Sequence, residues 1–316
     1  MATIATAAER SNISGKHLEF KGVFPANPTP VYADGRINEK ALKNIFEDNL
    51  AHGVDGFWVA GSTGEGPVMS EMQREATARV AGETISGKGL SIMHVGAIST
   101  ESAANGAKAA KDYGCDAICC VPPFFFRGGD QMTIDHYRRV ADAAEGLPFF
   151  VYNLPQLTQV EINPDLMEKI VDAVPNVVGL KHSAMNFGDI RLFADMGLKC
   201  FSGNGTLPLP ALTMGAVGTV DAPLSIAPWH YSELYNAWEQ GDMKTAQRLQ
   251  DGVFEIVNVV RMFGAPAAVT KLILSERLGV DCGRPIPPVT DLTDEQRVIV
   301  LAAAKNAGLL EAPIWK

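Results

Sequence analysis

Residues Phe149–Ser183, FFVYNLPQLTQVEINPDLMEKIVDAVPNVVGLKHS, carry the clearest signal of how the chain folds. Two short apolar runs, Phe149–Tyr152 and Val177–Lys181, predict buried strands. Between them Asn163 precedes Pro164, which predicts a helix N-cap followed by proline at the first helical position. The stretch therefore predicts a strand, a helix and a second strand in one repeating unit.

The same kind of unit recurs along most of the chain. Together with the two runs above there are eight predicted strands: Gly22–Pro28, Gly56–Ala60, Ser91–Val95, Ala117–Val121, Phe149–Tyr152, Val177–Lys181, Lys199–Ser202 and Gly218–Asp221. Helix starts lie between them, as at Ser70 with Gln73, which form a capping-box pattern, and at Asn38 before Glu39. Eight alternations without the glycine fingerprint of a dinucleotide-binding sheet predict an α/β fold, a (β/α)8 TIM barrel.

The later part of the chain departs from this alternation. After Ala227 we expect helices only: Thr245–Val260, Ala265–Leu278 and Asp294–Asn306. The pattern predicts a mobile N-terminal tail at residues 1–18, a barrel at 19–226, and a C-terminal helical region packed on the barrel at 227–316, all within one large domain.

Composition narrows the class of partner. The formal net charge is −9, from 27 Lys and Arg against 36 Asp and Glu, and no basic cluster occurs, so we expect no binding to nucleic acid. No run of eighteen apolar residues is present, so no membrane span is predicted. Five cysteines, with Cys119 and Cys120 inside a predicted strand, indicate reduced thiols and a cytoplasmic protein. Small-molecule chemistry is favoured.

The end of the sixth predicted strand carries the first candidate catalytic group. In a barrel of this kind the reacting groups lie at the C-terminal ends of strands. Lys181 ends the apolar run Val177–Leu180, where burial favours a neutral amine that can attack a carbonyl. On position alone, a lysine that reaches solvent is the commoner interpretation. The neighbouring strand ends reverse that preference.

Two further strand ends supply polar groups. The loop Gly61–Gly66 lacks the ending of a phosphate-binding P-loop, but its backbone N–H groups and the hydroxyls of Ser62 and Thr63 suit a carboxylate. Alone, the loop is equally consistent with a tight turn. Tyr152 places a phenol near Lys181, where it can relay a proton, although a buried tyrosine more often only satisfies a hydrogen bond.

Other chemistries find no support in the sequence. The six histidines and five cysteines show no His-x-x-x-His or Cys-x-x-Cys spacing, so no metal ion is predicted. A Gly-x-Ser-x-Gly nucleophile elbow is also absent, which argues against a hydrolase triad.

Three motifs together resemble a known family. Gly61-Ser62-Thr63-Gly64-Glu65, Tyr152-Asn153-Leu154-Pro155 and Gly179-Leu180-Lys181 are similar to the signature set of the dihydrodipicolinate synthase and N-acetylneuraminate lyase family, the class I pyruvate-dependent aldolases. The resemblance extends from Gly22 to the final helices.

The resemblance implies specific roles for the motif residues. Lys181 would form an imine with pyruvate and no other cofactor would be needed. Tyr152 would be the proton shuttle, and Ser62 and Thr63 would bind the substrate carboxylate. The family is usually a homotetramer, so we expect one here.

Departures from the family motifs bear on the substrate. Leu157 stands where dihydrodipicolinate synthases carry an arginine, and Phe124–Phe126 replaces a tyrosine of the loop after the fourth strand, so lysine biosynthesis is not favoured. Gly203–Thr206 replaces the Gly-Tyr-Asp-Glu run of N-acetylneuraminate lyases, so sialic acid is not favoured either. The apolar Phe124–Phe126 loop predicts an aldehyde half less polar than a sialic acid chain.

Asp221, Asn204 and Phe125 are therefore the candidate substrate-binding residues. Asp221 ends the eighth predicted strand and can bind a hydroxyl or act as a base, with a helix N-cap as the equally weighted alternative. Arg127 is better explained as a solvated loop residue than as a carboxylate ligand.

The sequence thus predicts a lyase that reversibly cleaves a 2-oxo-3-deoxy or 4-hydroxy-2-oxo acid to pyruvate and an aldehyde. The alternatives are a dehydratase that uses the same imine, with Asp221 as base, and a dihydrodipicolinate synthase or N-acetylneuraminate lyase proper. A non-catalytic 2-oxo acid sensor is the alternative from a different class, which the presence of Tyr152 disfavours.

Overall fold

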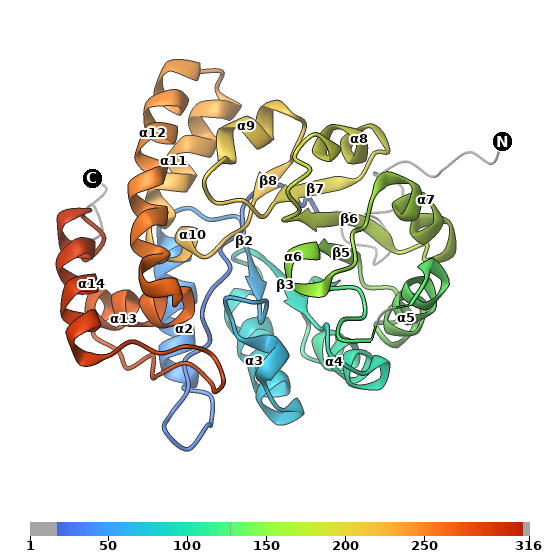
Figure 1. Cartoon of the computed structure of the whole chain (residues 1–316), viewed down its shortest axis with the longest axis horizontal. Coiled ribbons are helices and arrows are strands. Elements are labelled where there is room, and N and C mark those ends of the chain that lie inside the picture. The colour runs from blue at the N-terminus through green and yellow to red at the C-terminus, as the bar shows by residue number, and fades with distance from the viewer. Residues whose placement is uncertain (1–17, 127, 312–316) are drawn as a thin grey trace.

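The strands form one parallel sheet that curves back on itself (Figure 1). The computed structural model of the chain describes residues 18–126 and 128–311. The eight strands are arranged in the order β1-β8-β7-β6-β5-β4-β3-β2. The two edge strands of the sheet, β1 and β2, lie side by side. There the Asp55 N–H donates to the Val23 carbonyl and the Trp58 N–H donates to the Pro25 carbonyl, each at 3.0 Å. This arrangement confirms the predicted barrel.

The strands lie where the sequence predicts them; β1, β2, β4 and β8 end earlier than predicted, whereas β5 and β6 each extend one residue further. They are β1 (Gly22–Val23), β2 (Gly56–Val59), β3 (Leu90–His94), β4 (Ala117–Cys120), β5 (Phe149–Asn153), β6 (Val177–His182), β7 (Lys199–Ser202) and β8 (Gly218–Thr219). The prediction Gly22–Pro28 for the first strand is too long, because Pro25 and Pro28 have no N–H to donate to a neighbouring strand.

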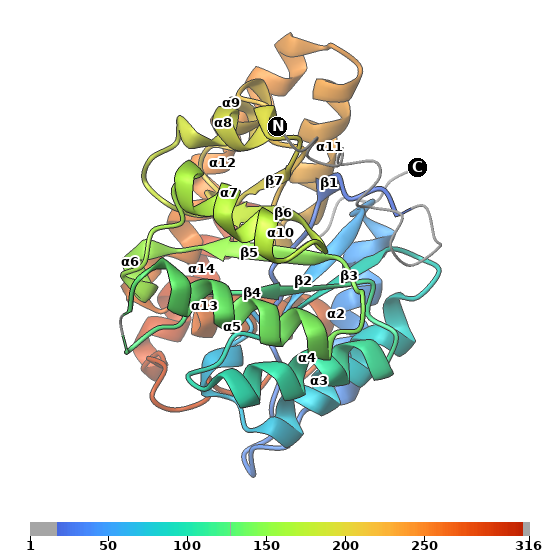
Figure 2. The same cartoon turned by 90° about the vertical axis from the view of Figure 1, so that its right-hand side faces the viewer.

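Helices follow the strands around the outside of the barrel. Those of the barrel are α2 (Glu39–Ala51), α3 (Glu71–Ile85), α4 (Thr100–Asp112), α5 (Asp130–Ala143), α6 (Pro155–Thr158), α7 (Pro164–Ala173), α8 (Asp189–Asp195), α9 (Pro208–Thr213) and α10 (Pro223–Ile226), with a 3₁₀ turn at Gly66–Val68 (η1). The predicted caps Asn38 and Asn163 and the capping box of Ser70 with Gln73 are confirmed. Figure 2 shows α3, α4 and α5 as a layer outside the strands.

The hydrophobic core has two parts, one on each side of the strands. Outside the barrel, aromatic pairs such as Phe46 with Phe57 join helices to strands. Inside it, the Trp58 ring lies 5.5 Å from the ring of Phe150 and 5.6 Å from that of Phe201. These fully buried rings fill the barrel interior, so the barrel is a packed core and not a channel.

A group of later helices packs against one side of the barrel (Figure 1). They are α11 (Pro228–Glu239), α12 (Met243–Val260), η2 (Met262–Gly264), α13 (Pro266–Leu278) and α14 (Asp294–Asn306). The boundary at residues 226 and 227 stays a prediction, and the predicted tail falls outside the described residues except for Leu18. Over the ranges that the structure describes, no helix is both long and apolar enough to cross a bilayer.

Candidate active site

Strand register brings Lys181 and Tyr152 together. The two residues are partners on the adjacent parallel strands β6 and β5, so both side chains point into the barrel. Each is only 4 % exposed. The Lys181 Nζ lies 4.6 Å from the centroid of the Tyr152 ring and 5.7 Å from that of Trp58. The amine therefore sits between two aromatic rings at the inner end of the barrel mouth.

The loop Gly61–Gly66 lies next to this pair. The Ser62 Oγ is 3.4 Å from the Tyr152 hydroxyl oxygen. The loop is tight, since the Gly66 N–H donates to the Gly61 carbonyl, and a Cβ on Gly66 would lie 1.8 Å from the Ala60 oxygen. The absence of a side chain at residue 66 therefore allows the turn that presents Ser62 and Thr63.

A buried ion pair anchors the same loop from behind. The Glu65 Oε2 lies 2.5 Å from the Lys271 Nζ of α13, and the two side chains are 0 % and 1 % exposed. The Ile286 N–H donates to Glu65 at 2.6 Å, and Lys271 also donates to the Arg284 carbonyl. Burial raises the pKa of the Glu65 carboxyl, and the Lys271 ammonium opposes that rise. The pair fixes the loop to the C-terminal region.

His94, at the end of β3, packs against the far side of Tyr152. Its ring is perpendicular to the Tyr152 ring, with centroids 5.9 Å apart. The Nδ1 lies 3.2 Å from the Ala60 carbonyl and must be the donor, since a carbonyl only accepts. Burial, helped by the charge of Lys181, lowers the His94 pKa to about 3. His94 is therefore a neutral residue that supports the tyrosine, and only its strand-end position could have drawn attention to it.

Asp221 and Asn204 shape the loops beside the site. The two Asp221 carboxylate oxygens accept from the Gly205 N–H at 2.9 Å and the Ala222 N–H at 2.8 Å. The Asn204 Oδ1 accepts from the Thr206 N–H and hydroxyl. Both side chains line the cavity, and their hydrogen bonds hold the loops that follow β7 and β8.

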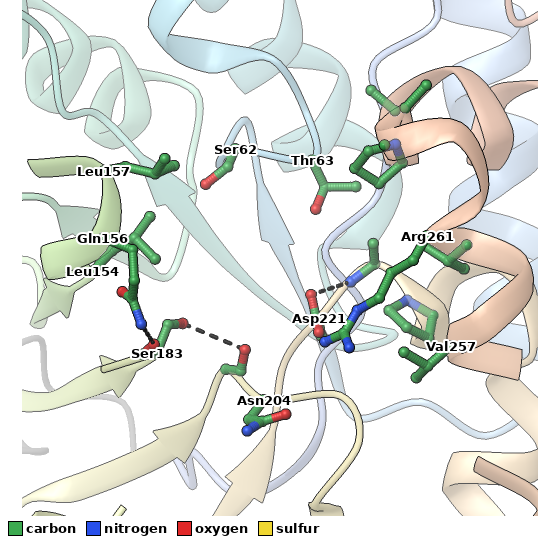
Figure 3. A pocket seen from close by; sticks show the side chains of 18 of the residues that line it. Ser62, Thr63, Leu154, Gln156, Leu157, Ser183, Asn204, Asp221, Val257 and Arg261 are labelled. Atoms are coloured by element: carbon green, nitrogen blue, oxygen red, sulfur yellow. Dashed lines mark hydrogen bonds between the residues drawn. The ribbon is translucent and has the colours of Figure 1, made fainter. Parts of the chain in front are cut away.

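One cavity of about 660 Å³ opens onto these groups (Figure 3). Its polar lining consists of Ser62, Thr63, Tyr152, Gln156, Ser183, Asn204, Asp221, Arg261 and Thr290. Its apolar lining includes Leu154, Leu157, Met185, Val257, Val260, Pro288 and Val289. Lys181 is not one of the lining residues; it lies behind Tyr152 and Gly203, which do line the cavity, since a Cβ on Gly203 would be 3.2 Å from the Lys181 Cε. Later helices therefore form one wall of the site.

Phe125 lies outside this cavity, contrary to its expected place in substrate binding. Its side chain is 80 % exposed and packs against the Phe126 ring, with centroids 5.1 Å apart. The loop that carries it turns outward at Phe125, whose φ is 75°. The apolar character of the cavity comes from other residues, and Arg127 falls outside the described residues.

The cavity also includes residues that the sequence did not single out. Arg261 and Thr290 come from the C-terminal region, and Gln156 and Ser183 follow β5 and β6. Of these, Gln156 could have been found from its place directly after the Tyr152 motif. Among residues 18–126 and 128–311, no three or more His, Cys, Asp or Glu side chains gather in a way that could hold a metal ion.

A family model covers nearly the whole chain. The model described as "Dihydrodipicolinate synthetase family" matches residues 19–307. The chain belongs to the dihydrodipicolinate synthetase family. The predicted family is therefore confirmed, and with it the prediction of a lyase of the class I aldolase type.

The chain is similar to curated proteins named N-acetylneuraminate lyase. The protein of that name from Citrobacter koseri is 32% identical over 277 residues, which are 86% of this chain and 93% of the relative. The one from Salmonella typhimurium is 32% identical over 275 residues, which are 86% of this chain and 92% of the relative.

Solved structures of the dihydrodipicolinate synthetase family share the fold. The wild-type sialic acid aldolase of Ruminococcus gnavus superposes with a TM-score of 0.87 at 28% identity, covering 92% of this chain and 98% of the other. A variant of the same aldolase is described as its catalytic lysine mutant. The N-acetylneuraminate lyase of Proteus mirabilis has a TM-score of 0.85 at 26% identity, with 92% and 100% covered.

Proposed function

We propose that this chain reversibly cleaves a 2-oxo-3-deoxy or 4-hydroxy-2-oxo acid to pyruvate and an aldehyde, through an imine on Lys181. One observation carries the proposal. The Lys181 amine lies 4.6 Å from the centroid of the Tyr152 ring, Tyr152 lines the cavity, and its hydroxyl oxygen is 3.4 Å from the Ser62 Oγ. A nucleophile, a proton relay and a carboxylate-binding loop therefore meet at one point.

The first half of the reaction forms the imine. The hydroxyls of Ser62 and Thr63 donate to the substrate carboxylate and hold its neighbouring carbonyl carbon beside the Lys181 amine. The Lys181 amine, in its unprotonated form, adds to that carbon and gives a carbinolamine. Tyr152 donates its proton to the carbinolamine hydroxyl, which leaves as water, so that an iminium ion and a tyrosinate remain.

The second half breaks the carbon–carbon bond. The Tyr152 tyrosinate takes the proton of the C4 hydroxyl, the C3–C4 bond breaks, and its electron pair moves into the iminium to form an enamine. The aldehyde leaves, and Tyr152 gives the proton that it has taken to C3, which converts the enamine to the pyruvate iminium. Water then adds to the iminium while the tyrosinate takes one of its protons, and the resulting carbinolamine collapses to pyruvate and the free Lys181 amine. The iminium is the electron sink, so the proposed chemistry requires no metal ion.

The dehydratase alternative is not favoured. It would use Asp221 as an additional base, yet both Asp221 oxygens already accept backbone N–H bonds. Curated relatives are named N-acetylneuraminate lyase, and a structural neighbour is a sialic acid aldolase, so both names describe carbon–carbon bond cleavage. The aldehyde that this chain accepts is a separate question.

Borohydride reduction tests the proposal directly. Incubation with pyruvate and sodium borohydride should convert the imine into a stable secondary amine, and peptide mapping by mass spectrometry should place the adduct on Lys181. The fully buried Lys271 serves as an internal control, since its ammonium is paired with Glu65. No adduct, or an adduct on a different lysine, would contradict the proposal.

Tyr152→Phe should slow cleavage without preventing imine formation. The loss of a positioned acid–base group lowers rates by about 10²–10⁴-fold, so we expect kcat to fall within that range. Borohydride should still trap pyruvate on the variant, because Lys181 remains. Tyr137→Phe is a matched control, since this fully buried tyrosine lies outside the cavity. A kcat close to that of the wild type for Tyr152→Phe would remove the tyrosine from the mechanism.

Assembly and location remain predictions of the family resemblance and the composition. We propose a homotetramer in the cytoplasm, with a 2-oxo acid and an aldehyde as the small-molecule partners and no nucleic-acid or membrane partner.

A further inference from the structure

The cavity wall carries two charged side chains among the described lining residues, Asp221 and Arg261. The Asp221 carboxylate is engaged by the Gly205 and Ala222 N–H groups. Arg261 differs. Its guanidinium has no carboxylate within ion-pair distance and no hydrogen-bond acceptor across residues 18–126 and 128–311, whereas most arginines of that part of the chain have a carboxylate partner.

Arg261 is exposed to solvent and lines the cavity. It follows the last residue of α12, and its side chain extends from that helix into the cavity toward Asp221 (Figure 3). Ser62 and Thr63, which would hold the carboxylate of the 2-oxo acid, lie on a different wall of the same cavity. A substrate bound to Ser62 and Lys181 can therefore extend its other end toward the guanidinium.

The apolar residues around Arg261 strengthen its preference for an anion. Val257 and Val260 of the same helix line the cavity, so a bound substrate would displace water from a partly apolar surface. Removing water from a guanidinium without supplying a hydrogen-bond acceptor costs free energy. A carboxylate or phosphate avoids this cost, because it can accept hydrogen bonds from two guanidinium N–H groups at once. A neutral aldehyde chain offers no such match.

We propose that the aldehyde half of the substrate ends in an anionic group, a carboxylate or a phosphate, and that Arg261 binds it. This inference rests on the proposed aldol cleavage and adds the substrate class to it. The substrates are then 4-hydroxy-2-oxo diacids, or 2-oxo-3-deoxy acids with an acidic or phosphorylated far end. Arg261 is a specificity-determining residue, and the imine chemistry does not depend on it.

A competing explanation is that Arg261 only stabilises the C-terminus of α12, where a cation interacts favourably with the helix dipole. Lys305 provides the matched control, since it is an exposed cation in the last turn of α14 and outside the cavity lining. Arg261→Met and Lys305→Met each remove one cation from the end of a helix. Only the first removes a charge from the cavity.

The test compares pyruvate release from three substrates of similar length: a 4-hydroxy-2-oxo diacid, its terminal phosphate counterpart and a neutral analogue with a terminal hydroxyl. The ratio of kcat/KM for the preferred anionic substrate to that for the neutral analogue should fall about 10–100-fold in Arg261→Met, since hydrogen bonds to charged groups have that effect. Arg261→Lys should give an intermediate ratio, and Lys305→Met the wild-type ratio.

The outcomes separate this inference from the function on which it rests. Wild-type protein that prefers the neutral analogue, or an equal ratio in wild type and Arg261→Met, would overturn the role of Arg261. Of the two anionic substrates, the one with the larger kcat/KM relative to the neutral analogue identifies the bound anion as a carboxylate or a phosphate. Borohydride trapping of pyruvate in the wild type is the independent readout: if trapping fails, the proposed function itself fails.

Discussion

Replacing Lys181 by arginine should abolish borohydride trapping of pyruvate and lower the rate of pyruvate release by about 10⁴–10⁶-fold, the range for removal of a catalytic nucleophile. The guanidinium keeps the positive charge but cannot add to a carbonyl carbon. Steady-state assays of the purified variant, together with its circular dichroism spectrum, would measure the loss and check the fold.

Lys199→Arg is the matched control for this result. Lys199 begins the neighbouring strand β7, is half-buried, and does not line the cavity. The same substitution there should leave trapping intact. Turnover in Lys181→Arg that stays within tenfold of the wild type would show that charge alone is required, and the covalent mechanism would then be abandoned.

Lys271→Met should be strongly destabilising. It leaves the Glu65 carboxylate at 0 % exposure without its counter-ion, and breaking a buried ion pair from one side costs about 3–5 kcal/mol. Chemical denaturation would measure the free energy of unfolding. Because Glu65 carries the loop of Ser62 and Thr63, we also expect a higher KM for the 2-oxo acid, with a smaller change in kcat.

Two further variants test whether burial of the Glu65–Lys271 pair causes the loss of stability. The double variant Glu65→Leu/Lys271→Met should recover much of the lost stability, since an apolar pair of similar volume often replaces a buried ion pair without cost. Lys169→Met breaks the exposed pair with Asp130, in which the side chains are 57% and 51% exposed, and should change stability far less. Equal destabilisation by Lys271→Met and Lys169→Met would contradict the role assigned to burial.

The sequence was sufficient to predict the positions of residues at the ends of strands. Tyr152 and Lys181 each end an apolar run, and parallel strands of a barrel present their ends at one mouth, so their proximity followed from strand order. The loop at Gly61–Gly66 followed from the same rule. The position of Phe125 outside the cavity could not be predicted, because a loop after a strand can turn either way and nothing in the run of three phenylalanines specifies the direction.

Contacts between distant parts of the chain could not be predicted from the sequence. Ile286 and Glu65 are 221 residues apart, and their hydrogen bond depends on how the C-terminal helices pack on the barrel. Arg261 entered the cavity for the same reason. Its place at the end of a helix gave no sign of a ligand, because a cation there is common in any protein.

The two walls of the cavity come from different parts of the chain, and this has an evolutionary consequence. The groups assigned to bond making and breaking lie on β5, β6 and the loop after β2, whereas Val257, Val260 and Arg261 belong to the end of α12. Mutations in that late segment can exchange one aldehyde for another and leave the reacting centre unaltered. Paralogues with different substrate specificities can thus arise from substitutions confined to the end of α12.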